Sequence, residues 1–243
     1  MARSGRRRLR RLGALVAEAY PDLDPDEAVR SGSILVDGFV ATNPATLVGA
    51  GASVALRRGD DPPLRGEAKL SAAIDRFAVP VAGRVALDVG ASAGGFTRVL
   101  LRRGARRVYA IDAGHGQLLG SLRQDLRVVS LERTNLADLD DSLVPEEVGV
   151  VTVDVSYVSL AKAVPQLARR VRMERRADLI ALVKPQFELG LARPPTGTDA
   201  LAEAVESAAV GIAEAGWSVE ATIESPVRGS RGSVEFLVHG IRR

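Results

Sequence analysis

The chain has 243 residues, 46% of them hydrophobic, a net charge of +3 and no cysteine. This length can form one large or two small domains with an apolar core. The absence of cysteine excludes a disulfide framework, a thiolate zinc site and a cysteine nucleophile, and with only two histidines we expect no metal. The composition is typical of a globular protein, and the absence of cysteine fits a reducing cytoplasm. The apolar run from Leu12 to Ala17 is too short for a signal peptide or a membrane span.

Six arginines lie within the first eleven residues. Such a concentration of positive charge favours contact with phosphates, as in RNA, although a solvated tail would have the same composition. The residues that we expect to bind RNA in this way are Arg6, Arg7, Arg8, Arg10 and Arg11.

Residues 1–58 predict a small α+β domain. Its expected elements are a basic helix from Arg8 to about Tyr20, a second helix that begins near Asp24 and stops at Gly32, and a small sheet. The pair Asp37-Gly38 between two apolar runs is a strong hairpin signal, and residues 53–56 can complete the sheet. Residues 59–66 are charged and rich in proline and glycine, which predicts a linker.

Strands and helices alternate through residues 67–243, so we expect a second domain with an α/β, Rossmann-like fold. A mostly parallel sheet should be covered on both faces, and the short turn between the last two strands indicates an antiparallel terminal strand. The expected strands are 84–89, 107–112, 127–131, 149–154, 178–184, 217–223 and 233–239, and the expected helices are 68–77, 95–103, 117–123, 159–170 and 200–215.

A glycine-rich loop follows the first of these strands and predicts a nucleotide-cofactor site. Gly90, Gly94 and Gly95 allow the backbone to approach a ligand, and Asp112, at the end of the next strand, can accept hydrogen bonds from a ribose diol. Ser92 stands where a dinucleotide site needs glycine, which argues against NAD, and no Gly-Lys-Ser/Thr follows. S-adenosylmethionine (SAM) is therefore the expected cofactor; the alternative is a turn that only closes a βα unit.

Three ionisable residues stand at strand termini: Asp154 and Lys184 end the fourth and fifth of these strands, and Glu235 lies near the start of the last strand. The chain has only three lysines, at positions 69, 162 and 184, against thirty arginines. A lysine at the end of a buried strand needs a partner such as Asp154, so a structural ion pair is one interpretation. Lysine can also lose its proton near neutral pH, which arginine cannot do, so catalysis is the other interpretation.

The segment after the fourth of these strands, Asp154-Val-Ser-Tyr157, lacks the two prolines common in enzymes that methylate base amines. Methylation of a pyrimidine carbon through an adduct needs a cysteine, which is absent. An oxygen acceptor remains, such as a ribose hydroxyl. A lysine whose pKa is lowered by burial and by a second ammonium is a suitable base for that acceptor.

The chain resembles the TlyA family over nearly its whole length. Members of that family carry the names of haemolysins and of ribosomal-RNA 2′-O-methyltransferases, and they are related to the FtsJ/RrmJ heat-shock methyltransferase. The resemblance rests on five motifs: Leu87-Asp-Val-Gly-Ala-Ser-Ala-Gly-Gly-Phe-Thr97, Val108-Tyr-Ala-Ile-Asp112 with Gly116-Gln117, Leu131-Glu-Arg-Thr-Asn135, Val153-Asp-Val-Ser-Tyr-Val-Ser-Leu160 and Leu182-Val-Lys-Pro-Gln-Phe-Glu188.

This resemblance implies a catalytic tetrad of Lys69, Asp154, Lys184 and Glu235, in which Lys184 acts on the 2′-hydroxyl and the others orient it and tune its charge. It also implies that residues 1–58 are an S4-like RNA-binding domain and that ribosomal RNA or a ribosomal subunit is the partner. The cofactor-binding residues that we expect are Asp88, Gly90, Ala91, Ser92, Gly94, Gly95, Phe96, Asp112, Asn135 and Asp154.

The chain departs from the family pattern at the start of the second helix of its N-terminal domain. The family carries a Ser-Arg pair there, whereas this chain has four acids at Asp22, Asp24, Asp26 and Glu27, which repel RNA. The substrate is therefore open, and an RNA-binding or ribosome-assembly factor of the same fold without methyl transfer is the alternative function. Membrane lysis lacks support, since we find no apolar span and no strongly amphipathic basic helix.

Overall fold

The computed structural model describes residues 9–49, 51–57, 64–229 and 232–242. The N-terminal unit begins with β1 (Leu9–Arg11), which pairs antiparallel with β4 (Leu47–Gly49). Helices α1 (Leu12–Ala19) and α2 (Pro25–Arg30) follow β1. The carboxylate of Asp24 begins α2 by accepting a hydrogen bond from the backbone N–H of Glu27 at 2.9 Å.

A three-stranded sheet completes this unit. Its central strand β2 (Ile34–Val36) pairs antiparallel with β3 (Phe39–Ala41) and with β5 (Val54–Leu56). The predicted hairpin is confirmed, because Asp37 and Gly38 both have positive φ, 52° and 81°, as the tight turn between twisted strands requires. Leu12, Val16, Val29, Ile34 and Val48 form the apolar core of the unit.

The second unit alternates strands and helices from residue 64 onward, as the sequence predicts. In chain order its elements are α3 (Arg65–Phe77), β6 (Val85–Val89), α4 (Gly95–Arg102), β7 (Arg107–Asp112), α5 (Gly120–Arg123), β8 (Val128–Glu132), the 3-10 turn η1 (Leu136–Asp138), β9 (Val148–Val153), α6 (Leu160–Arg170), β10 (Met173–Val183), α7 (Pro185–Glu188), α8 (Thr198–Glu214), β11 (Trp217–Glu224) and β12 (Phe236–Arg242).

These strands form a seven-stranded sheet in the order β11-β12-β10-β9-β6-β7-β8. The central strands pair in parallel, whereas β12 is antiparallel to both of its neighbours. The mostly parallel sheet with a terminal antiparallel strand is thus confirmed. This strand is the last along the chain, yet it lies inside the sheet rather than at its edge, between β10 and β11.

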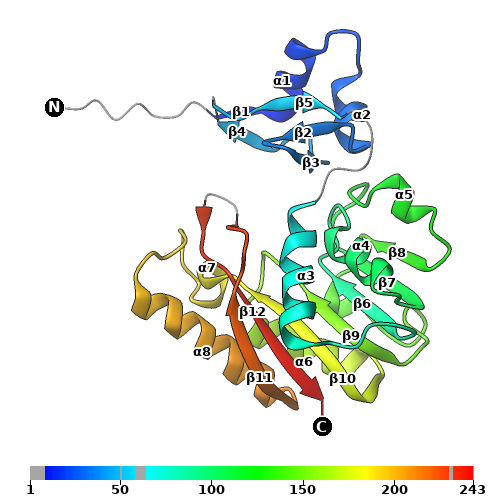
Figure 1. The fold of residues 1–243 in the computed structure, drawn as a ribbon, viewed down its shortest axis with the longest axis vertical. Coiled ribbons are helices and arrows are strands. Elements are labelled where there is room, and N and C mark those ends of the chain that lie inside the picture. Colours follow the sequence, from blue (N-terminus) through cyan, green and yellow to red (C-terminus); the bar gives the residue numbers. More distant parts are fainter. Residues whose placement is uncertain (1–8, 50, 58–63, 230–231, 243) are drawn as a thin grey trace.

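Helices cover both faces of the sheet (Figure 1). Leu70 of α3 and Leu100 of α4 pack on one face with Ala86 of β6. Leu167 of α6 and Ile212 of α8 pack on the other face. This three-layer arrangement follows from the apolar composition of the strands, which require cover on both sides. No helix in the described part of the chain is long and apolar enough to cross a membrane.

Several element boundaries differ by three or more residues from the sequence-based expectation, including α5, which begins at Gly120 instead of residue 117, and β12, which spans Phe236–Arg242 instead of 233–239. The helix expected from Arg8 begins at Leu12, because Leu9–Arg11 pair with β4 instead. Helix α3 begins at Arg65, so the last two residues of the expected linker are helical. Strand β10 begins at Met173, five residues before the expected start, and its pairing with β9 is irregular between Met173 and Asp178.

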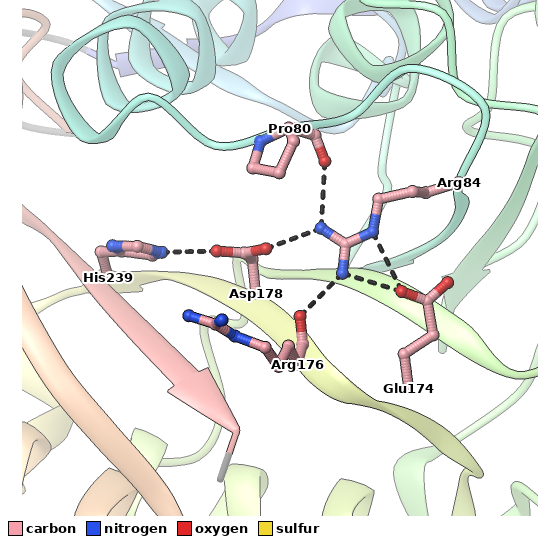
Figure 2. Close-up of polar contacts among 6 residues, drawn as sticks. All are labelled: Pro80, Arg84, Glu174, Arg176, Asp178 and His239. Atoms are coloured by element: carbon pink, nitrogen blue, oxygen red, sulfur yellow. Dashed lines mark hydrogen bonds and ion pairs between the residues drawn. The ribbon is translucent and has the colours of Figure 1, made fainter.

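Arg84, just before β6, organises the edge of the sheet at which the parallel strands begin (Figure 2). Its guanidinium donates to Asp178 Oδ2 at 2.6 Å, to Glu174 Oε2 at 3.0 Å and to the carbonyl oxygens of Pro80 and Arg176. His239 Nε2 lies 2.8 Å from the other oxygen of Asp178. Hydrogen bonds from His239 and Arg84 outweigh burial and lower the pKa of Asp178. This network joins β6, β10 and β12 at the edge opposite the carboxyl ends.

The two units contact each other through a cation–π contact and through apolar side chains packed on a glycine. The guanidinium of Arg65 in α3 lies 5.0 Å from the centroid of the Phe39 ring in β3. A side chain on Gly32, which has a φ of 76°, would come within 2.5 Å of Leu119 in the second unit. Val40 also packs against the core beneath α3 and α4.

Candidate active site

The carboxyl ends of the parallel strands face the N-terminal unit. In Figure 1 the arrow of β12 points away from that unit, so β10, which is antiparallel to β12, and the strands parallel to β10 point toward it. Asp154 follows β9, Lys184 follows β10, and Glu235 directly precedes β12. Val183 is opposite Phe236 in the antiparallel ladder, so Lys184 and Glu235 occupy the next positions along it. The sheet thereby brings three of the expected catalytic residues to one edge.

Lys184 bridges two groups on the segment after β9. Its Nζ lies 2.5 Å from Asp154 Oδ1 and donates a hydrogen bond to Ser156 Oγ at 2.7 Å. The side chains of Lys184 and Asp154 are 15% and 24% exposed, so the pair is largely shielded but reachable from solvent. Sequence reasoning did not single out Ser156, although it stands two residues after Asp154 and its hydroxyl was a usable signal.

Lys69 reaches the same edge from α3. Its Nζ meets Glu235 Oε2 at 2.5 Å, and the two residues are only 7% and 5% exposed. Spacing in the sequence could not place Lys69, because its partner is 166 residues away. The four expected catalytic residues thus form two ammonium–carboxylate pairs, one buried and one partly accessible.

The glycine loop between β6 and α4 turns tightly through backbone conformations that favour glycine. Gly90 and Gly94 have φ of 84° and 96°, and a side chain on Gly90 would collide with the carbonyl oxygen of Asp154. Gly95 begins α4 and packs on Gly66, with its would-be Cβ 3.1 Å from the Gly66 Cα. The ring of Phe96 is buried in the core rather than presented to the loop.

Asp88 is a buried carboxyl inside the sheet beneath this loop. Thr97 Oγ1 and Thr152 Oγ1 donate to its two oxygens at 2.6 Å and 2.9 Å. Burial raises the pKa of Asp88 to about 6, with a smaller contribution from the charge of Asp154, although both threonines oppose this shift. Asp88 therefore anchors the loop to α4 and β9, and its side chain is not free to contact a cofactor directly.

Asp112 lies at the end of β7, next to the loop. Its Oδ2 accepts a hydrogen bond from the Ser92 N–H at 2.8 Å, and its Oδ1 accepts from the Gly114 N–H at 2.7 Å. Each carboxylate oxygen has a second lone pair, so two ribose hydroxyls can still donate to it. Burial, and to a lesser degree the charge of Asp112, raise the pKa of the mostly exposed Tyr157 hydroxyl.

Glu132, at the end of β8, is a site residue that the sequence analysis missed. Its Oε1 accepts hydrogen bonds from the backbone N–H groups of Gln117 and Leu118, at 2.8 Å and 3.3 Å. These bonds outweigh burial and lower the pKa of Glu132. The signal that identified Asp112, an acid that ends a strand, also applies here.

Asn135, which the sequence analysis expected to bind the cofactor, is exposed and caps η1 through Asp138.

Glu188 connects the segments that carry Asp154 and Lys184. Its Oε1 accepts a hydrogen bond at 2.8 Å from the backbone N–H of Leu160, the first residue of α6. Burial raises the pKa of this carboxyl above its ordinary value, although the backbone N–H groups at the helix start oppose the shift. The segment after β10 is thereby tied to the segment after β9.

Two of the five arginines that we expected to bind RNA lie among the described residues. Arg10 pairs with Glu18 at 2.8 Å on the exposed surface, and Arg11 is exposed at the end of β1. Arg6, Arg7 and Arg8 lie outside the described residues. Among the described side chains, no group of histidines and acids is arranged to hold a metal ion.

The sequence of the chain is similar to known methyltransferases over most of its length. A family model described as FtsJ-like methyltransferase matches residues 64–242. The 16S/23S rRNA (cytidine-2′-O)-methyltransferase TlyA of Mycobacterium tuberculosis is 40% identical over 219 residues, which are 87% of this chain and 81% of that protein. Hemolysin A of Brachyspira hyodysenteriae is 32% identical over 221 residues, 88% of this chain and 91% of that protein.

A solved structure of a Streptococcus thermophilus protein described as a candidate hemolysin matches with a TM-score of 0.72 and 29% identity, covering 96% of this chain and 88% of that one. Since this match covers nearly all of the chain, it includes both units. The likeness therefore concerns the complete arrangement and not only the sheet with the glycine loop.

Proposed function

This chain belongs to the family of FtsJ-like methyltransferases, and we propose that it transfers a methyl group from SAM to the 2′-hydroxyl of a ribose in ribosomal RNA. One observation carries the proposal: two lysine–carboxylate pairs, Lys184 with Asp154 and Lys69 with Glu235, meet beside a glycine loop at one edge of the sheet. The name of the Mycobacterium tuberculosis relative supports the choice of ribose in ribosomal RNA. Such a substrate would place the enzyme in the cytoplasm.

The residues present fit SAM. Gly90 and Gly94 have the positive φ that gives the loop its tight turn, and Asp112 offers a carboxylate to a ribose diol at the end of the neighbouring strand. When bound, SAM supplies an electrophilic methyl group on a sulfonium. Ser92 and Gly114 hold the Asp112 carboxylate in place, so the acceptor is positioned before the ligand arrives.

Lys184 is the residue that we propose acts on the ribose hydroxyl. The hydroxyl must lose its proton as its oxygen forms a bond to the methyl group, and Lys184 Nζ is the basic atom nearest the accessible side of the pair. Asp154 Oδ1, at 2.5 Å, can take a proton from Nζ, which would free the amine to accept the proton of the hydroxyl. Ser156 fixes the direction of Nζ.

Lys69 and Glu235 are positioning residues in this proposal. Their pair is buried, so it supplies a fixed arrangement of charge next to Lys184 rather than a proton carrier in exchange with solvent.

Site-resolved mapping of ribose methylation tests the proposal. Purified bacterial 30S and 50S subunits that lack the modification are incubated with SAM and the parent protein, or with Lys184→Ala. We expect one or a few ribose positions to gain a methyl group with the parent only. Binding of subunits without any new ribose methylation would instead support an assembly factor.

A further inference from the structure

A cleft of about 770 Å³ lies between the two units. This volume is in the range of ligand-binding sites. The N-terminal unit contributes one wall, which includes Arg11, Arg30 and Asn43. The segment after β7 and helix α5 contribute the other wall, which includes His115, Gln117 and Arg123. The cleft is therefore built from both units.

Positive charge dominates this cleft. Arg11 and Arg123 form no side-chain hydrogen bond or ion pair within the described parts of the chain. Arg30 meets only the exposed Asp26, at 3.5 Å. Three guanidinium groups thus line the cleft with one carboxylate, Asp26, while Glu132 behind the lining also interacts with Arg123. This excess of guanidinium groups attracts anions. The described lining includes no phenylalanine, tyrosine or tryptophan, so its charge is the main feature that a ligand meets.

One end of the cleft connects with the proposed cofactor site. Gln117 accepts a hydrogen bond from Ser92 Oγ of the glycine loop at 3.1 Å. Its backbone N–H is held by Glu132, whose other carboxylate oxygen lies 3.5 Å from His115 Nδ1. A molecule in the cleft would therefore contact the segment that packs directly on the glycine loop.

We propose that this cleft binds the sugar–phosphate backbone of the RNA substrate, with its phosphates at Arg11, Arg30 and Arg123. The proposal rests on the proposed function and names a binding site for that substrate. Guanidinium groups suit phosphates, because their planar donors pair with phosphate oxygens in two-point contacts. Contacts of this kind carry no sequence information, and they position the strand in register with the active site.

The acids at the start of α2 make one side of this cleft unfavourable for phosphates. A neighbouring hollow of about 430 Å³ is lined by Asp24, Asp26 and Glu27 together with Arg30 and Arg123. Phosphates are repelled from this acidic side. The RNA backbone therefore passes along the wall formed by Arg11 and Asn43 and avoids the start of α2. The acidic residues then act as a border and do not prevent RNA binding.

Cross-linking from a single cysteine tests the position of the RNA. The chain has no cysteine, so Ala45→Cys, exposed in the cleft, and Ala213→Cys, exposed on α8, can each carry one photo-cross-linker. Both labelled proteins are mixed with purified bacterial 30S and 50S subunits and irradiated. We expect cross-links to ribosomal RNA from position 45 and not from position 213. Equal yields from the two positions would overturn the proposal.

The salt dependence of binding tests the arginines. Arg11→Gln and Arg123→Gln should each lower the slope of log K against log salt by about 0.7–0.9, which is about a sixfold loss of affinity at 0.1 M salt. Arg175→Gln is the matched control, because Arg175 is exposed in a separate hollow with Arg176 and Arg242. Losses of equal size in all three variants would also overturn the proposal.

Failure of this site and failure of the proposed function give different results. If the parent methylates ribose in subunits while the cross-links and slopes show no preference for the cleft, only the cleft proposal is wrong. If the parent neither binds nor methylates the subunits, both proposals are wrong. Bound SAM, measured by calorimetry in every variant, confirms that each variant is folded.

Discussion

Lys69 and Glu235 stand 166 residues apart in the chain, yet their side chains meet at 2.5 Å where they are 9% and 5% exposed. This contact joins α3, the first helix of the second unit, to the start of its last strand. A buried ion pair contributes little net stability, whereas removal of one partner leaves an uncompensated charge. Loss of either residue should therefore disturb both the stability of the fold and the arrangement of side chains at the carboxyl edge of the sheet.

Replacement of one partner should destabilise the protein strongly. Lys69→Met leaves the Glu235 carboxylate buried without its ammonium, and we expect the free energy of unfolding to fall by about 3–5 kcal/mol. The double variant Lys69→Met/Glu235→Met should recover most of that loss in urea unfolding. Its ribose methylation should remain low, because both charges are absent. A double variant with parental turnover would show that the pair is only structural.

Lys184→Arg should be nearly as inactive as Lys184→Ala. The guanidinium keeps the positive charge but does not release a proton, and its planar fork differs in shape from the ammonium that contacts Asp154 and Ser156. General-base contributions are about 10²–10⁴ in rate, so a single-turnover methylation assay resolves the loss. SAM affinity should change little. Lys162→Arg, on α6, is the control and should keep its activity. Near-parental turnover of Lys184→Arg would mean that the proton leaves by another route.

Asp112→Ala should weaken SAM binding. The carboxylate is a charged acceptor held by two backbone N–H groups, and the loss of such an acceptor costs about 1.5–3 kcal/mol. Titration calorimetry on the purified protein measures this difference directly. Glu203→Ala, an exposed acid on α8, serves as the control and should bind as the parent does. Equal affinities for Asp112→Ala and the parent would remove Asp112 from the cofactor site.

The stability of the protein should depend on the protonation of Asp88. Burial raises the pKa of this group to about 6 in the folded state, so the folded protein holds the proton more tightly than the unfolded chain. The contribution to stability is complete below about pH 4 and is lost as pH rises through about 6. From pH 4 to pH 8 the parent should therefore lose about 1–3 kcal/mol more than Asp88→Asn.

Urea unfolding at both pH values measures this difference. Asp199→Asn, an exposed acid in the first turn of α8, should follow the parent. Parallel pH profiles for the parent and Asp88→Asn would contradict the raised pKa.

The elements that depend on local signals were predictable from the sequence. The strand Val85–Val89, the glycine turn after it and the Asp37-Gly38 hairpin each follow from a short pattern of apolar residues and glycines. Strand β1 was not predictable, because its sequence Leu9–Arg11 suits the start of a basic helix and only the distant Leu47–Gly49 makes it a strand. Tertiary pairing overrode the local preference there.

The candidate site shows the same division. The strand-end positions of Asp112, Asp154 and Lys184 could be identified from the pattern of strands. The role of Glu132 could not be predicted from the sequence. Its carboxylate accepts hydrogen bonds from the backbone N–H groups of Gln117 and Leu118, about fifteen positions earlier in the chain. Backbone donors have no signature in the side-chain sequence, so such contacts become visible only in three dimensions.

Strand β12 both completes the sheet and places Glu235 against Lys69. A chain that ended before Phe236 would leave β10 and β11 with unpaired edges, exposed to association with other chains. It would also leave Leu237 and Val238, which are fully buried, out of the two cores that they connect. The same loss would remove Glu235 from Lys69. A molecule in which β12 is not seated in the sheet therefore lacks the placement that holds Glu235 against Lys69, and we expect it to be inactive.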